Sequence, residues 1–240
     1  MLRGFHATEE VNGLKRMIYI SGICLLLCAA TIFTASCESM GRPENEAPQT
    51  EELLINLSRI DELPEDLTLV NAGNPLPEDF QPNALVNLYN QENRHFQLAK
   101  ADIEVCETVF EAMNTMFAAA KREGITDFII TSGYRSREDQ EEIFSAATDG
   151  VAAKPGESEH ETGLAFDVVA MGDDNFELTP HFEWLSAHCA EYGFIIRYPK
   201  DREDVTGIPY EPWHYRYVGK EHAVRIMDKE ITLEEYLRKR

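Results

Sequence analysis

Cysteine is scarce in this chain of 240 residues, and its positions leave little room for disulfides. Three of the five cysteines, Cys24, Cys28 and Cys37, lie within or at the end of one apolar run. Only Cys106 and Cys189 remain for the rest of the chain, and no pair has the spacing of a metal-binding cysteine motif. We expect both to be buried free thiols, and one disulfide between them is the alternative.

Basic residues are also few. The chain has 22 Lys and Arg against 43 Asp and Glu, which gives a formal net charge of -21. A chain this acidic is repelled by phosphate backbones, which argues against nucleic acid as a partner. The surplus of acidic residues is typical of a protein that stays soluble through its charge. No sequence feature indicates an obligate protein partner.

Only one long apolar run occurs, at residues 17–36, and it carries no charge. Twenty such residues in a helix span roughly the 30 Å of bilayer hydrocarbon. Arg3, Lys15 and Arg16 precede the run and acidic residues dominate after it. The positive-inside tendency therefore predicts a membrane segment with a cytoplasmic N-terminus and an extracellular remainder.

Three fates of this segment are open. An uncleaved signal anchor is our first choice, but Thr34–Cys37 places small residues before a cysteine, as in a bacterial lipoprotein, and simple secretion is the third. A stretch rich in Glu, Pro, Asn and Gln follows and indicates a linker. The predicted division is a cytoplasmic tail at 1–16, a transmembrane anchor at 17–36, a linker at 37–64 and a folded domain at 65–240.

The folded domain mixes helical and strand patterns in irregular order, which predicts an α+β fold with a small antiparallel sheet flanked by helices. Apolar residues recur at helical spacing over 101–123 and stop at Gly124. Residues 128–131 follow as a short buried strand. Ser136 and Asp139 form a capping box that predicts a helix to about residue 148.

Two motifs carry candidate chemistry. His160 precedes the apolar run 164–169, which contains Asp167 and reads as a buried strand, while His214 lies in Glu211-Pro-Trp-His214 before another alternating strand. Two His and one Asp match a catalytic zinc site that leaves a fourth position open. Glu211 would then be the general base. We interpret Trp213 as a wall of the site or a core residue, without a chemical role.

Other acidic residues and histidines in this region receive a simpler interpretation. Glu157, Glu159 and Glu161 flank the proposed ligand His160, and their alternation is typical of a solvated loop edge. The remaining histidines of the folded domain lack an acidic partner at metal spacing, so we interpret them as surface or packing residues: His95, His181, His188 and His222.

The order of the motifs resembles one family. Ser158-Glu-His-Glu-Thr-Gly-Leu-Ala-Phe-Asp167 followed by Glu211-Pro-Trp-His-Tyr-Arg-Tyr-Val-Gly219 is similar to the VanY-type D-alanyl-D-alanine carboxypeptidases, which are zinc enzymes that trim peptidoglycan stem peptides. The likeness covers roughly residues 67–240 and extends to further segments: Ser132–Ser136, Pro155–Ser158, Tyr192–Phe194, Arg197–Pro199 and Leu233–Tyr236.

This resemblance implies the hedgehog/D,D-peptidase fold, one Zn²⁺ per chain and removal of the C-terminal D-alanine from peptidoglycan stems at the bacterial membrane. It also implies that Arg135 holds the peptide's terminal carboxylate, whereas from the residue alone an ordinary surface Arg is the expectation. Gln140 and Ser158 match positions that contact substrate in such enzymes.

Three alternatives to this activity are open. Relatives within the resemblance also cut the L-Lys-D-Ala bond of tetrapeptides, and an endopeptidase of the same fold is a further candidate. A non-catalytic wall-binding module with a structural zinc is the candidate from another class. The presence of Glu211 argues against it, because a structural zinc site needs no base.

Overall fold

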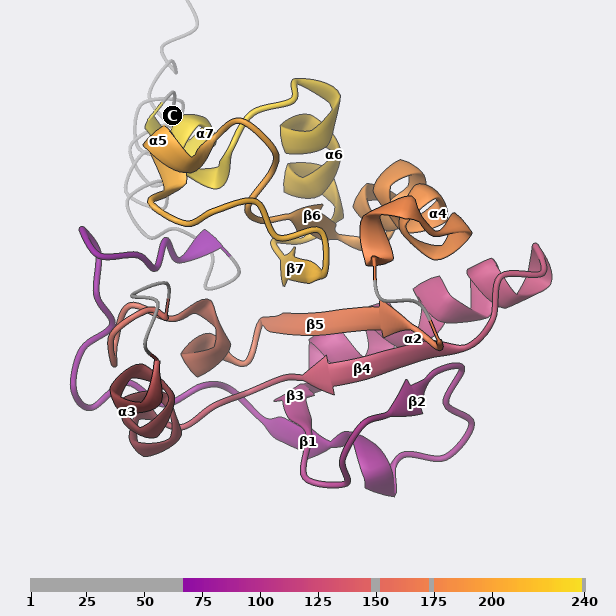
Figure 1. Cartoon of the computed structure of the whole chain (residues 1–240), viewed down its shortest axis with the longest axis horizontal. Coiled ribbons are helices and arrows are strands. Elements are labelled where there is room, and N and C mark those ends of the chain that lie inside the picture. Colours follow the sequence, from indigo (N-terminus) through magenta and orange to yellow (C-terminus); the bar gives the residue numbers. More distant parts are fainter. Residues whose placement is uncertain (1–66, 148–151, 173–174, 239–240) are drawn as a thin grey trace, which may run out of the picture. The chain divides into compact units, whose positions relative to one another are not determined.

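The computed structural model describes residues 67–147, 152–172 and 175–238. The predicted anchor, the linker and the three cysteines of the N-terminal region lie outside these residues. Within the described ranges, no helix is both long and apolar enough to cross a membrane. The first described residue of the folded domain is Leu67 (Figure 1).

A five-stranded sheet forms the centre of this domain, with strand order β2-β4-β5-β7-β6. Its strands are β2 (Gln97–Leu98), β4 (Phe128–Ser132), β5 (Ala165–Ala170), β6 (Phe194–Ile196) and β7 (His214–Tyr217). The sheet is mixed, which corrects the expected antiparallel sheet: β2 pairs with β4 in parallel, because a long segment carries the chain back to the same end. The other pairs are antiparallel. A separate antiparallel pair joins β1 (Leu85–Asn87) and β3 (Glu104–Cys106).

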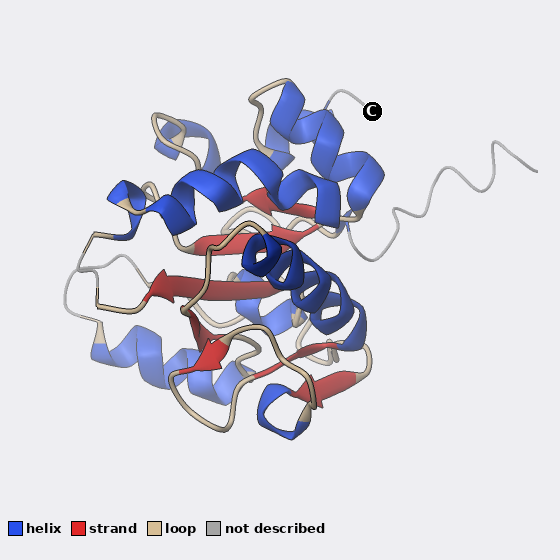
Figure 2. Ribbon diagram, turned by 90° about the vertical axis from the view of Figure 1, so that its right-hand side faces the viewer, coloured by secondary structure: helices blue, strands red, loops and turns tan. Residues whose placement is uncertain are grey.

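Helices pack around the sheet, as predicted for an α+β fold (Figure 2). The α-helices are α2 (Glu107–Arg122), α3 (Arg137–Ala146), α4 (Pro180–His188), α5 (Glu203–Thr206), α6 (Lys220–Asp228) and α7 (Leu233–Arg238). Short 3₁₀ helices lie between the strands and α-helices: η2 (Leu88–Asn90), η3 (Glu159–Thr162), η4 (Phe176–Leu178) and η5 (Cys189–Tyr192).

The largest hydrophobic core lies between α2 and one face of the sheet. Phe117 of α2 contacts Phe128 of β4 with ring centroids 4.7 Å apart, and Phe166 of β5 at 6.2 Å. All three side chains are fully buried. Because side chains alternate along a strand, Phe166 and Val168 point to α2 while Asp167 points to the opposite face. The core thus fixes β5 from one side and leaves the other side for chemistry.

The helix predicted over 101–123 is wrong at its start, because α2 begins only at Glu107. The preceding residues form β3 instead, in which Val105 pairs with Val86 of β1 and is fully buried. Tertiary pairing outweighs helix propensity over so short a segment. The predicted end is confirmed: the cap residue is Glu123, and Gly124 follows with a φ of 86°.

The capping box of α3 is present as predicted. The Ser136 side chain accepts a hydrogen bond from the Asp139 backbone N–H, and the Asp139 side chain accepts one from the Ser136 backbone N–H. The helix ends at Ala146, while the residues predicted to end it fall outside the described ranges. The box fixes the start of α3 directly after Arg135 and so sets the direction in which that side chain leaves the loop.

Candidate metal centre

Asp167 and His214 are direct cross-strand neighbours on β5 and β7. Residues in register on antiparallel strands point to the same face, so both side chains leave the sheet on the side opposite α2. The Asp167 Oδ1 and His214 Nδ1 atoms are 3.0 Å apart. Strand pairing alone therefore brings together two of the three predicted ligands, although 47 residues separate them in the chain.

His160 reaches the same point from η3, the turn that precedes β5. Its Nε2 lies 3.4 Å from Asp167 Oδ1. Its Nδ1 lies 2.6 Å from the Gly133 carbonyl oxygen, to which it donates, so that Nε2 carries the free lone pair. The turn closes at Gly163 with a φ of 70°, a left-handed conformation that favours glycine. A side chain there would also meet Cys106 Sγ at 2.8 Å.

The three side chains fit a metal ion. One ligand atom from each of His160, Asp167 and His214 can be chosen so that all lie within 4.8 Å of one another. Burial raises the pKa of Asp167, but the two histidines outweigh that effect and hold its pKa far below the usual range. Two imidazole nitrogens and a carboxylate oxygen are the donor set of a catalytic zinc site.

Protonation compensates for the charge of Asp167 when no metal is bound. Burial lowers the pKa of His214, but the neighbouring carboxylates of Asp167 and Glu159 outweigh it and raise that pKa to about 9. Burial lowers the pKa of His160, which stays the more readily neutral of the two rings. The site therefore holds a positive charge beside Asp167 near neutral pH, in the place where a cation would bind.

Glu211 lies beside this centre on the segment that enters β7. Its Oε2 is 3.8 Å from His214 Nδ1, and its backbone N–H donates to the Tyr198 carbonyl oxygen over 3.1 Å. Burial raises the pKa of the Glu211 carboxyl. The turn through Pro212 and Trp213 ends where His214 donates its N–H to Glu211 O. The carboxylate and the metal ligand are thus held in one tight turn.

Arg135 extends from the loop between β4 and α3 toward the same centre. Its Nη1 donates to Gln140 Oε1 over 2.7 Å, and Gln140 Nε2 donates to the Ala153 carbonyl oxygen over 2.7 Å. The Arg135 Nε is buried without a hydrogen-bond partner among the described residues. Burial lowers the pKa of Arg135, which an arginine tolerates without losing its charge. Gln140 therefore orients the guanidinium, and the Nε–H group stays available to donate to an anionic ligand.

One cleft of about 630 Å³ contains all seven residues that the sequence singled out. His160, Asp167 and His214 lie in it with Glu211 and Arg135, and Ser158 and Gln140 line it too. Trp213, 39% exposed, lines the cleft together with Ile143 of α3, as expected of a wall residue. A peptide's charged terminus, its scissile bond and a metal ion would fit into one continuous space.

The expectation for Glu159 and Glu161 is wrong, since both are buried rather than solvated. Glu161 accepts from the Gly156 N–H and pairs with Arg137 at 3.5 Å, whereas Glu159 lies behind His214. The missed signal lies in Ile195-Ile-Arg197 and Tyr215-Arg216-Tyr, where a basic residue interrupts a buried strand. A buried arginine requires an acidic partner, and Glu159 supplies it.

His181 and His188 pack against aromatic side chains as predicted, although His188 also pairs with Glu191 at 3.0 Å. His181 lies edge-on to Phe128, and His188 stacks on Trp184 with ring centroids 4.6 Å apart. Cys106 and Cys189 are buried and are not bonded to each other, so the alternative of a disulfide between them is wrong. Among the described residues, the cluster of metal-binding type is His160, Asp167 and His214.

Comparisons with known proteins point in one direction. The family model described as VanY, D-alanyl-D-alanine carboxypeptidase, matches residues 102–220. The chain is 42% identical to YodJ of Bacillus subtilis strain 168 over 188 residues, which are 72% of this chain and 67% of YodJ. It is 33% identical to a D-alanyl-D-alanine carboxypeptidase of Enterococcus faecium over 72% of this chain and 57% of that protein.

Solved structures agree with these matches. The LdcB LD-carboxypeptidase superimposes with a TM-score of 0.64 at 38% identity, over 71% of this chain and 85% of LdcB. The vancomycin-resistance D,D-pentapeptidase VanY, solved in complex with Zn(II), superimposes with a TM-score of 0.62 at 34% identity, over 72% of this chain and 99% of that one.

Proposed function

Because this chain belongs to the VanY family of D-alanyl-D-alanine carboxypeptidases, we propose that it is a zinc hydrolase that removes the C-terminal D-alanine from peptidoglycan stem peptides. One observation carries the proposal: the metal triad, an acidic side chain and an oriented arginine line the same cleft. Each group has a task in cutting a peptide bond next to a free carboxylate.

His160, Asp167 and His214 would hold the zinc ion, and a zinc ion bound there would supply a Lewis acid for the scissile carbonyl and the attacking water. The protein orients these ligands before any metal binds. Asp167 and His214 are set by strand register, and His160 is set by its hydrogen bond to Gly133 O. The ligands therefore need little reorganisation on binding.

Glu211 is the general base of the proposed reaction. Its carboxylate lies 3.8 Å from His214 Nδ1 and lines the same cleft as the three proposed ligands. It would accept a proton from the attacking water as the water oxygen bonds to the scissile carbonyl carbon. It then passes the proton to the departing D-alanine nitrogen as the carbon–nitrogen bond breaks, so the proton count balances.

Arg135 binds the terminal carboxylate of the peptide through two parallel hydrogen bonds. Gln140 orients the guanidinium from one side, and Ser158, buried at the cleft wall, offers a hydroxyl to the peptide. The clamp fixes how far the scissile bond lies from the chain end. The enzyme would therefore remove one terminal residue instead of cutting internally.

The same geometry admits an L,D-carboxypeptidase acting on tetrapeptide stems, and the likeness to LdcB favours this second candidate. An endopeptidase of the same fold fits less well, because an oriented arginine in the cleft suits a free terminus. A binding module with a structural zinc is the weakest candidate, since it would have no use for Glu211 beside the metal.

Product analysis decides among these candidates. The full chain, loaded with zinc, is incubated separately with pentapeptide and tetrapeptide muropeptides, and the products are weighed by mass spectrometry. Loss of one alanine from the pentapeptide alone supports the D,D activity. Loss from the tetrapeptide moves the assignment to L,D. Intact substrates in the presence of bound zinc would overturn the carboxypeptidase proposal.

We further propose that residues 17–36 attach the enzyme to the bacterial membrane and that the domain from residue 65 acts outside the cell. The uncharged run with basic residues before it supports this topology. Lipidation of Cys37 and secretion are the alternatives. Fractionation of cells that express wild type and Cys37→Ser separates them: an anchor keeps both in the membrane, lipidation only the wild type, and secretion neither.

A further inference from the structure

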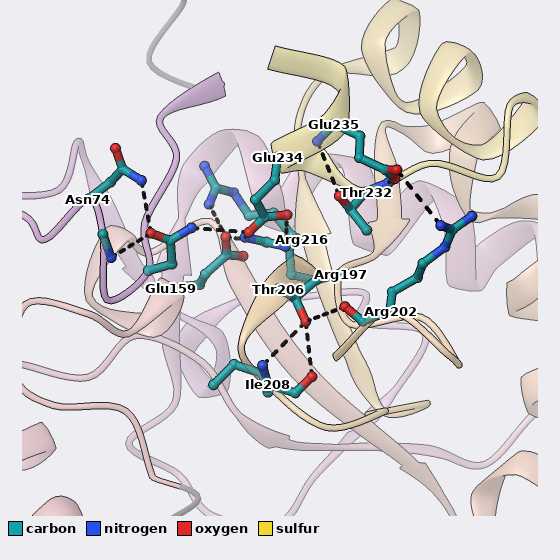
Figure 3. A network of polar contacts seen from close by, with 12 residues as sticks. Asn74, Glu159, Arg197, Arg202, Thr206, Ile208, Arg216, Thr232, Glu234 and Glu235 are labelled. Carbon is teal, nitrogen blue, oxygen red and sulfur yellow. Dashed lines mark hydrogen bonds and ion pairs between the residues drawn. The ribbon is translucent and has the colours of Figure 1, made fainter. Parts of the chain in front are cut away.

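Figure 3 shows four buried charged residues that form an ion cluster. One of them, Glu159, lies beside the proposed metal ligand His214. Arg197 Nε donates to Glu159 Oε1 over 2.6 Å, and Arg216 Nη1 lies 2.9 Å from the same oxygen. Arg197 also holds Glu234 of α7 with both terminal nitrogens, over 3.0 and 2.6 Å. Both arginines are fully buried. We call these four residues the buried ion cluster.

Two further hydrogen bonds tie the cluster to the first described segment of the chain. Arg216 Nη2 donates to the Thr68 carbonyl oxygen over 2.8 Å, and Asn71 Nδ2 donates to Glu234 Oε1 over 3.2 Å. It thus joins η3, the residue after β6, β7, α7 and the first described residues of the chain. Two of its members lie in Arg197–Pro199 and Leu233–Tyr236, which are among the segments that resemble the family. The proposed reaction does not use either segment.

Glu159 has one oxygen that the arginines do not use. Its Oε2 lies 3.8 Å from His214 Nε2, and neither atom has a hydrogen-bond partner among the described residues. Both residues are buried, so water does not replace the missing partner for either group at low cost. Glu159 Oε2 is therefore an acceptor without a donor, and His214 Nε2, when protonated, is a donor without an acceptor.

We propose that Glu159 is a positioning residue for the metal ligand His214, an inference that rests on the proposed zinc function. Its second oxygen accepts the Nε2 proton of His214 and so keeps the ring in the tautomer whose Nδ1 lone pair faces Asp167. Arg197 and Arg216 occupy the first oxygen and prevent the carboxylate from turning. Glu159, held in place by the two arginines, therefore sets which nitrogen of His214 is free for zinc.

Replacement of Glu159 by Gln separates this role from simple stability. The amide oxygen of Glu159→Gln would stay with the two arginines, and the amide N–H₂ would then face His214 Nε2. A donor at that place favours the opposite tautomer, in which Nδ1 carries the proton and competes with zinc. Loss of such outer partners typically costs about 10- to 100-fold in metal affinity.

Glu234→Gln is the matched control, because it removes a carboxylate from the same cluster without contact to His214. Zinc affinity is measured by competition with a chelator, and folding by thermal unfolding of the metal-free proteins. We expect weakened zinc binding in Glu159→Gln and unchanged binding in Glu234→Gln. Wild-type affinity in a folded Glu159→Gln, or equal losses in both variants, would overturn the proposal.

A second measurement on the wild type does not depend on how the variants fold. Two-bond ¹H–¹⁵N NMR correlations on histidine-labelled, zinc-loaded protein report which ring nitrogen carries the proton. We expect a protonated Nε2 in His214, and a protonated Nδ1 would contradict the proposal. Zinc binding with this tautomer but without cleavage of any muropeptide overturns only the proposed function, and a wild type that binds no zinc overturns both.

Discussion

Asp167 and His214 lie opposite each other on β5 and β7, on the sheet face that α2 leaves uncovered. The backbone pairing that builds the sheet is therefore the same pairing that builds the metal centre. Asp167 is flanked in β5 by Phe166 and Val168, whose burial against α2 holds the strand in register. A slip by one residue would turn Asp167 into the core. The packing of the core therefore fixes the register that places Asp167 in the site.

We expect the metal-free protein to stay folded while activity is lost. The hydrophobic core lies across the sheet from the metal ligands, and the protonated His214 ring compensates Asp167 when no cation is present. Dialysis against a chelator should retain the far-UV circular dichroism spectrum and abolish hydrolysis, and added zinc should restore hydrolysis. Binding to the native state alone should raise the melting temperature as zinc is added. Unfolding on chelation would show that the metal is structural.

Glu211→Gln should keep zinc and lose turnover. The amide preserves the shape of the side chain but does not accept a proton, so kcat should fall by about 10²- to 10⁴-fold, the usual contribution of a general base. Zinc content is measured by atomic absorption and turnover by release of D-alanine. Near wild-type turnover in this variant would remove Glu211 from the role of base.

Glu221→Gln serves as the control for that variant. Glu221 lies on α6, and its exposed side chain pairs with Arg225 four residues later. The same chemical change on the surface should leave both zinc content and turnover unchanged, because exposed pairs of this kind contribute about 0.3–0.5 kcal/mol. A loss common to both variants would indicate a general effect of removing negative charge.

Gly163→Ala should destabilise the domain more than Gly124→Ala. Both glycines have a positive φ, which costs a residue with a Cβ about 1–2 kcal/mol. A Cβ at Gly124 meets nothing within 4 Å, whereas one at Gly163 meets Cys106 Sγ at 2.8 Å and Leu85 Cδ2 at 3.0 Å. Overpacking of this kind adds about 1–3 kcal/mol. Urea unfolding of both variants checks the order, and equal losses would show that the neighbours move aside freely.

The site could be predicted from the sequence because its residues lie in short motifs with local signals. The apolar run around Asp167 indicated the strand, and the capping box at Ser136 placed Arg135 in the loop before α3. His160 was expected just before the strand that contains Asp167, and the turn η3 carries it there. Each signal depends on residues within a few positions of one another, which is the range that periodicity and capping rules cover.

What the sequence did not reveal depends on contacts between distant residues. Glu159 has the alternating polar context of a surface loop, yet Arg197 and Arg216 bury it from 38 and 57 positions away in the chain. The start of α2 was misplaced for the same reason, because Val105 is drawn into a strand by Val86. Local patterns carry no information on such partners.

The thiol of Cys189 should stay unreactive in the native protein up to strongly alkaline pH. Burial raises its pKa to about 12, so the nucleophilic thiolate is scarce at lower pH. Alkylation at pH 8 and pH 10, followed by peptide mass mapping, should leave Cys189 unlabelled in native protein. The same peptide after denaturation is the control and should be labelled fully. Rapid native labelling at pH 8 would show that the core around η5 opens.

The arginine clamp is tested by changing the protein and the substrate together. Arg135→Lys keeps the charge but loses the planar fork that holds a carboxylate by two hydrogen bonds. We expect kcat/KM to fall by about 10- to 100-fold, since charged hydrogen bonds are worth about 1.5–3 kcal/mol. A peptide amidated at its C-terminus lacks the anionic partner, so wild type should cleave it poorly.

The combination of variant and amidated peptide identifies the contact itself. If Arg135 binds the terminal carboxylate, Arg135→Ala should discriminate much less between the acid and the amide than wild type does, because the partner of the carboxylate is already gone. Losses that multiply independently would mean that Arg135 acts elsewhere, for example by holding Gln140 in place. In that case Gln140→Ala, which removes the hydrogen-bond partner of Arg135, should reproduce the effect of Arg135→Ala on both peptides.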